Sequence, residues 1–211
     1  ARLIGEGINT FVEKPFTSNI SQGESLISLS KEKRVKVTCG YIERFNPVTQ
    51  YIKKIGDVPQ LLEFHRQSKI PPHIHDVGIV FDTMVHDIDT ACQMFEGYPV
   101  KITSCVKSLK CKKEDMSIAT LEFTNDRIAN IVSNWNCSVK MRTVHATYPD
   151  KMIRGDFVKR EIKIVDQTGE HKPTIKDCEP LREELESFVS CVANDTQPAI
   201  TPYHANKVTE I

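Results

Sequence analysis

The period of the hydrophobic positions changes partway along the chain. In the first part, residues 9–12 are typical of a short buried strand, residues 21–33 follow helical spacing, and residues 35–41 again have strand character. Residues 1–4, followed by Gly5, are typical of the last turn of a helix. This order predicts an α/β segment with neighbouring parallel strands.

Beyond this segment the pattern predicts two helices and then a run of strands. Residues 47–55 and 79–95 have helical spacing, and residues 180–192 repeat it near the end, before a short helix near Pro202. The predicted strands are 102–109, 117–123, 127–135, 143–148 and 160–165. Consecutive strands after helices predict a mostly antiparallel open sheet with helices on one face, an α+β domain.

The whole chain is therefore expected to be α/β plus α+β. The α/β part covers residues 1–45, and the α+β part covers residues 46–211.

The composition argues against several classes of protein. The 211 residues carry 28 basic and 28 acidic side chains, and 39% are hydrophobic. A neutral balance argues against nucleic-acid binding, and no apolar stretch is long enough to cross a membrane. The seven cysteines contain no Cys-x-x-Cys pair, which argues against a disulfide framework and favours a reducing, cytoplasmic location.

Glu13-Lys14-Pro15 follows directly on the first predicted strand. Ligands of open α/β sheets bind at the carboxyl ends of the strands. A lysine there can hydrogen-bond a substrate hydroxyl or stabilise a developing alkoxide. By position alone, a solvated loop lysine is the alternative.

Asp82, His86 and Asp89 occur at spacings of four and three within a predicted helix. These spacings put the three side chains on one helix face. A carboxylate that orients an imidazole leaves its other nitrogen to act as a general base near neutral pH. A local ion pair on a helix is the alternative.

His73-Ile74-His75-Asp76, together with His86, suggests a different class of protein, a metal hydrolase. Alternating histidines point to opposite sides of an extended segment, and no fourth ligand is indicated. We therefore predict no metal site.

Two smaller signals are polar residues at strand ends. Arg44 follows a predicted strand, and its guanidinium suits a phosphate. Asn136 ends another strand, and its amide suits a sugar hydroxyl. Asn46 is a candidate cap for the helix 47–55.

In order and spacing, three motifs resemble a family of nicotinamide-dependent sugar and polyol dehydrogenases named for glucose-fructose oxidoreductase, inositol dehydrogenase and rhizopine catabolism proteins. The motifs are Val12-Glu13-Lys14-Pro15, the segment Gly40 to Pro47, and Asp82-x-x-x-His86-x-x-Asp89. The segments Tyr41 to Pro47 and Asp76 to Ile79, with His86 to Asp89, are most similar to the branch that oxidises the 3-hydroxyl of UDP-N-acetylhexosamines.

The resemblance implies hydride transfer to NAD or NADP without a metal. His86 would remove the hydroxyl proton, Asp82 would orient its ring, and Lys14 would steady the alkoxide. The resemblance further implies cofactor contacts from Glu13, Lys14 and Arg44. It implies substrate contacts from the following residues: Tyr41, Asn46, Asp89 and Asn136.

The family begins with a strand, a glycine-rich turn and a helix that bind the pyrophosphate, and this sequence starts after them. The resemblance therefore implies that residues 1–45 are a partial dinucleotide-binding (Rossmann) domain that lacks its first half. It implies that residues 46–211 are a domain for catalysis, substrate binding and oligomerisation. Gly5-Glu6-Gly7-Ile8-Asn9-Thr10 is not that turn, because Thr10 replaces the third glycine and a strand follows. We expect a part of a longer enzyme, with a non-redox sugar-binding or oligomerisation module as the alternative. The expected partners are a sugar or nucleotide sugar and further copies of the chain, bound through the C-terminal sheet, with no nucleic acid and no membrane.

Overall fold

The computed structural model describes residues 1–72 and 76–211. Contacts along the chain divide it into two units, one made of residues 1–45 and 179–211 and the other of residues 46–178.

The first unit contains a strand–helix–strand segment, as the sequence predicted. Strands β1 (Thr10–Glu13) and β2 (Val37–Gly40) pair in parallel, and helix α2 (Ile20–Lys33) connects them. Helix α1 (Arg2–Gly5) precedes β1, and the short helix η1 (Ile42–Phe45) follows β2. Two adjacent parallel strands place their carboxyl ends at the same edge, which is where ligands of α/β sheets bind.

Two C-terminal helices complete this unit. Helix α5 (Pro180–Ala193) contacts η1, and helix α6 (Pro202–Glu210) contacts α2 and β2. Between them, the Ile200 carbonyl accepts a hydrogen bond from Thr38 Oγ1 at 2.9 Å. The sequence pattern groups residues 179–211 with the second domain, whereas in the structure they contact elements of the first unit. Helical periodicity shows that a helix has an apolar face, but not which element covers that face.

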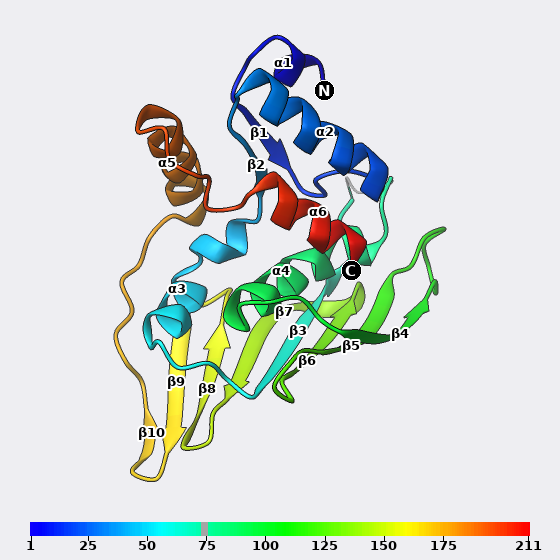
Figure 1. Ribbon diagram of the computed structural model, residues 1–211. Coiled ribbons are helices and arrows are strands. Elements are labelled where there is room, and N and C mark those ends of the chain that lie inside the picture. Colours follow the sequence, from blue (N-terminus) through cyan, green and yellow to red (C-terminus); the bar gives the residue numbers. More distant parts are fainter. Residues whose placement is uncertain (73–75) are drawn as a thin grey trace. The chain divides into compact units, whose positions relative to one another are not determined.

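The second unit is built on an eight-stranded sheet in the order β10-β9-β8-β7-β3-β6-β5-β4 (Figure 1). All neighbouring pairs are antiparallel except β3 with β6, so the expected mostly antiparallel sheet is confirmed. The strands are β3 (Leu61–Lys69), β4 (Lys101–Lys107), β5 (Met116–Glu122), β6 (Ile128–Asn134), β7 (Asn136–Thr147), β8 (Lys151–Asp156), β9 (Glu161–Asp166) and β10 (Gly169–His171).

Helices cover one face of this sheet, as expected. Helix α3 (Pro47–Lys54) contacts β8, and helix α4 (Val85–Met94) contacts β6 (Figure 1). Alternate strand residues form the core on this side, for example Leu62 and Phe64 of β3. Gly155 of β8 lets α3 approach closely, because a Cβ there would lie 2.4 Å from Val48 Cγ1.

The helix expected over residues 79–95 is not uniform. A π-helical turn, η2 (Val80–Met84), leads into α4. The backbone N–H of Val85 donates to the carbonyl of Val80, five residues earlier. Apolar periodicity does not distinguish one wide turn from an α-helical turn, so this feature was not predicted. π-helical turns are rare and occur often at functional sites.

Candidate active site

Glu13 and Lys14 lie at the carboxyl edge of the two-stranded sheet in the first unit. Glu13 ends β1 and pairs with Gly40 of β2. A Cβ on Gly40 would lie only 2.9 Å from Glu13 Oε2, so the glycine leaves room for this carboxylate. The structure therefore places an acidic side chain, followed by a basic residue, at an edge suited to ligand binding.

Arg44 is buried in the same unit and makes two structural contacts. Its Nη1 donates to the Ala199 carbonyl at 3.1 Å, and its Nη2 lies 2.6 Å from His204 Nε2. Because a guanidinium only donates, Nε2 must accept, which places the His204 ring proton on Nδ1. These bonds connect η1 to the α5–α6 region. Tyr41 is fully buried beside η1, and the ligand contacts assigned to Arg44 and Tyr41 stay predictions.

Asp82, His86 and Asp89 lie in the second unit, on η2 and α4. Asp82 is in the π-helical turn, partly exposed, and its Oδ2 accepts a hydrogen bond from Thr83 Oγ1 at 3.0 Å. His86 is in the first turn of α4 and is largely buried, whereas Asp89 is completely buried. The wider turn between Asp82 and His86 changes the angle that a regular α-helix would give them.

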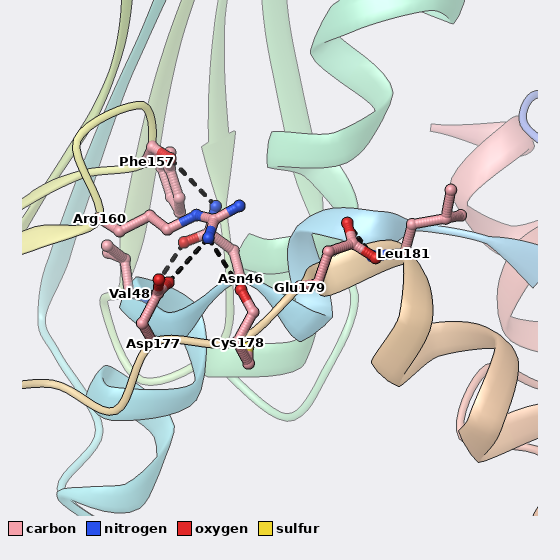
Figure 2. A network of polar contacts seen from close by, with 8 residues as sticks. All are labelled: Asn46, Val48, Phe157, Arg160, Asp177, Cys178, Glu179 and Leu181. Carbon is pink, nitrogen blue, oxygen red and sulfur yellow. Dashed lines mark hydrogen bonds and ion pairs between the residues drawn. The ribbon is translucent and has the colours of Figure 1, made fainter.

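Asn46 is the N-cap residue of α3, and both polar atoms of its side chain form hydrogen bonds inside the second unit. Its Oδ1 accepts from the Val48 backbone N–H at 3.1 Å, which confirms the predicted cap. Its Nδ2 donates to the Phe157 carbonyl at 3.2 Å (Figure 2). The substrate contact assigned to Asn46 stays a prediction.

The turn between β8 and β9 also holds the last residues of this unit. Arg160 Nη1 donates to Asp177 Oδ1 at 2.7 Å and to the Cys178 carbonyl at 2.9 Å (Figure 2). The turn at residues 157–160 therefore binds both Asn46, the first residue of the unit, and Cys178, the last one.

Asn136 is hydrogen-bonded to a carboxylate, Asp115, that no motif in the sequence indicates. Its Nδ2 donates to Asp115 Oδ1 at 3.0 Å. Asp115 is fully buried and also accepts from the backbone N–H groups of Leu109, Lys110 and Cys111. Burial alone would raise its pKa, but these bonds lower the pKa to about 2. The substrate contact assigned to Asn136 stays a prediction.

A second missed feature is the ion pair between Arg66 on β3 and Asp87 on α4. Both side chains are buried, at 2% and 0% exposure. The sequence did hold a signal for it. Side chains alternate between the two faces of a strand, so Arg66 lies on the same face of β3 as the buried Leu62 and Phe64. A cation on that face is buried and needs an acidic partner.

The metal-hydrolase alternative depends on His73 and His75, which lie outside the described residues. Among residues 1–72 and 76–211, no group of three or more histidine, cysteine or acidic side chains is arranged to hold a metal ion. In the same residues, no helix combines the length and apolar character needed to span a bilayer.

Comparison with protein families gives one match. Residues 55–151 match the model described as the GFO/IDH/MocA C-terminal domain. A UDP-N-acetylglucosamine 3-dehydrogenase from Acidithiobacillus ferrooxidans is 24% identical over 198 residues, which cover 89% of this chain and 63% of the relative. A scyllo-inositol 2-dehydrogenase (NAD(+)) from Bacillus subtilis is 22% identical, over 97% of this chain and 66% of the relative. The chain thus spans about two thirds of the length of these relatives.

Solved structures have the same fold. UDP-N-acetylglucosamine 3-dehydrogenase GnnA from Acidithiobacillus ferrooxidans matches with a TM-score of 0.91 and 23% identity, over 97% of this chain and 68% of that one. An oxidoreductase from Agrobacterium radiobacter, solved with NAD+, L-tartaric acid and magnesium, matches with a TM-score of 0.86 and 12% identity, over 98% of this chain and 69% of that one.

Proposed function

Because residues 55–151 match the model of the GFO/IDH/MocA C-terminal domain, we propose that the chain is the catalytic part of an NAD(P)-dependent sugar dehydrogenase. The observation that carries the proposal is the position of Asp82 and His86. Both lie inside the matched domain, on a π-helical turn and the α-helix that follows it. A histidine beside a carboxylate is suited to act as a general base near neutral pH.

In the proposed reaction, His86 takes the proton of a sugar hydroxyl. The C–H bond of the same carbon breaks, its electron pair leaves with the hydrogen as hydride, and a carbonyl group forms. Asp82 orients the imidazole, and the Lys14 ammonium stabilises the negative charge that develops on the oxygen. Tyr41, Asn46, Asp89 and Asn136 are proposed to contact the substrate.

The residues at the edge of β1 and β2 fit the ribose end of a nicotinamide cofactor. Glu13 offers a carboxylate that accepts hydrogen bonds from ribose hydroxyls, and Lys14 offers a donor next to it. When bound, NAD or NADP would supply the hydride acceptor. Arg44 is proposed as a further contact of this cofactor.

We propose a nucleotide sugar as substrate, oxidised at the 3-hydroxyl of a UDP-N-acetylhexosamine. Two lines of support are the 198-residue match to a UDP-N-acetylglucosamine 3-dehydrogenase and the segments at residues 41–47 and 76–89. We place the reaction in the cytoplasm, where free cysteines stay reduced.

The test is His86→Ala in the full-length native protein, assayed with UDP-N-acetylglucosamine and either NAD+ or NADP+. Loss of the base is expected to lower kcat by about 100- to 10,000-fold, with an unchanged circular dichroism spectrum. His65→Ala is the matched control, because this histidine is half-buried on the sheet face opposite Phe64 and is expected to keep the parental rate. A His86→Ala variant with the parental rate would contradict the assignment. Sugar binding without any nicotinamide reduction by the parent would favour the binding module.

We also propose that copies of the chain associate through the sheet face that the helices leave open. Ile118 of β5 and Ile128 of β6 are 51% and 37% exposed and alternate with the buried Ala119 and Ala129. Exposed apolar side chains on a sheet are a common feature of subunit interfaces. Ile118→Lys should lower the mass measured by sedimentation equilibrium to that of a smaller species. A parental mass for this variant would exclude this face.

A further inference from the structure

The buried ion pair of the second unit joins its central strand to the helix that carries His86. Arg66 Nε donates to both carboxylate oxygens of Asp87 at 2.8 Å. Arg66 lies on β3, which is paired on both edges, with β6 and with β7. Asp87 directly follows His86 in the first turn of α4. The pair therefore fixes the start of α4 to the middle of the sheet.

Phe157 supports the same guanidinium from another element. Its ring centroid lies 5.3 Å from Arg66 Cζ, within the range of a cation–π contact. The Phe157 carbonyl in turn accepts from Asn46 Nδ2. Arg66 is thus held by a carboxylate from α4 and an aromatic ring from the β8–β9 turn, so its own position is well defined.

A buried ion pair is weak evidence for stability, because the cost of removing two charges from water offsets their attraction. Unlike an apolar pair, the ion pair restricts the relative orientation of the two elements it joins, since a guanidinium and a carboxylate interact in few geometries. The orientation of α4 needs such a restraint at this point of the fold. The π-helical turn of residues 80–84 interrupts the regular helix just before α4, so the preceding backbone defines the rotation of α4 less strictly.

Neighbouring residues of an α-helix point about 100° apart around its axis. Once the Asp87 carboxylate is fixed on Arg66, the direction of the His86 side chain is fixed as well. We propose that Arg66 and Asp87 are positioning residues that set the rotation of α4, and with it the direction in which His86 faces. This inference rests on the proposed function for the role of His86 as base.

The test replaces the pair by apolar residues of similar volume, Arg66→Met with Asp87→Leu, in the full-length protein. Burial is kept and no single charge is left in the core, so the midpoint of denaturant unfolding should stay near the parental value. The kcat with UDP-N-acetylglucosamine should fall about 10- to 100-fold, whereas KM should change less than about twofold. The partly exposed pair Lys151–Asp57, replaced by Met and Leu, is the matched control with parental kcat.

A second readout does not depend on turnover. The imidazole nitrogen resonances of His86, assigned by its loss in His86→Ala, should shift in the Arg66→Met/Asp87→Leu variant and stay unchanged in the control. If the double variant does not fold, Arg66→Lys is tested, because it keeps the positive charge but removes the Nε donor. A smaller kcat loss is expected for it, with a His86 resonance shift in the same direction.

The outcomes separate the two proposals. A parent without nicotinamide reduction, combined with a shifted His86 resonance in the variant, would end the proposed function and keep the positioning role. Parental kcat and parental His86 resonances in a folded double variant would overturn the positioning role and leave the proposed function intact.

Discussion

The Asp115 carboxylate accepts hydrogen bonds from three successive backbone N–H groups and from the Asn136 amide. Burial opposes its ionisation, but these donors favour the charged form more strongly and lower the pKa from 3.8 to about 2. The folded-state pKa lies below the unfolded value. The carboxylate therefore stabilises the fold fully above about pH 4, and this contribution is lost as the pH falls toward 2.

We expect Asp115→Asn to lower the free energy of unfolding by on the order of 2 kcal/mol at pH 7. The difference from the parent should shrink as the pH falls from 4 to 2, where the parental carboxylate becomes protonated. Denaturant unfolding at a series of pH values measures this. Asp126→Asn, at an exposed turn position, should show no such trend. An equal loss for Asp115→Asn at pH 7 and pH 2 would mean that ionisation plays no part.

At this scale the sequence predicted those residues whose partners are local. Asn46 was predicted as a cap because its acceptor role depends only on the N–H two residues later. Asp115 was not found, because its link to Asn136 crosses a 21-residue separation and its loop carries no recognisable motif. The Arg66–Asp87 pair also joins two distant elements, although the alternation of side chains along β3 indicates that Arg66 is buried.

Among the elements, α2 and α6 pack closely at Gly23. A Cβ at Gly23 would lie 2.4 Å from Asn206 Cγ and 3.2 Å from its Cβ. Asn206 is buried, so its side chain has little freedom to move aside. The glycine therefore lowers the helix propensity of α2, but it allows α2 and α6 to approach closely.

Gly23→Ala should raise helix propensity by about 1 kcal/mol and lose more than this through overpacking, for a net destabilisation of about 1 kcal/mol. Removing the obstacle should reverse the sign. In the background Asn206→Ala, the same Gly23→Ala change should be stabilising. Chemical denaturation of the four proteins of this cycle gives the coupling energy. Additive effects of the two substitutions would contradict the close contact.

Periodicity predicted most elements but not their internal geometry. The α/β segment, the helices and five of the strands followed from apolar spacing alone. Periodicity does not predict three strands, β3, β8 and β10, and it does not distinguish the π-helical turn from a regular helix. The missed central strand β3 mixes buried and polar positions that include Arg66, so its composition resembles a surface segment.

For the molecule as a whole, the two units differ in how the chain builds them. Residues 46–178 form one continuous stretch, whereas the other unit needs both 1–45 and 179–211. We expect a fragment of residues 46–178 to fold by itself, with a cooperative thermal transition and a strand-rich circular dichroism spectrum. A fragment of residues 1–45 should stay unfolded, because α6 contacts both α2 and β2. A non-cooperative 46–178 fragment would contradict this division.

The association of residues 179–211 with residues 1–45 does not follow from the sequence pattern. Periodicity predicts the two helices of residues 179–211 but not the distant residues that this segment contacts: the Ile200 carbonyl, between these helices, accepts from Thr38 Oγ1 across 162 positions. The assignment of His86 as base, by contrast, rests on its motif and stays a prediction. Motifs report the chemistry of a site, and only the folded chain reports which elements support it.

The place of β3 in the sheet also has a consequence for protein synthesis. β3 emerges first of its sheet but lies between β6 and β7, so neither of its edges is paired until residues 128–147 have been made. An unpaired strand edge invites association with other chains. A growing chain on the ribosome therefore holds this strand unpaired on both edges while residues 70–127 are made. Chaperone binding to nascent chains should accordingly peak before Thr147 is released from the exit tunnel.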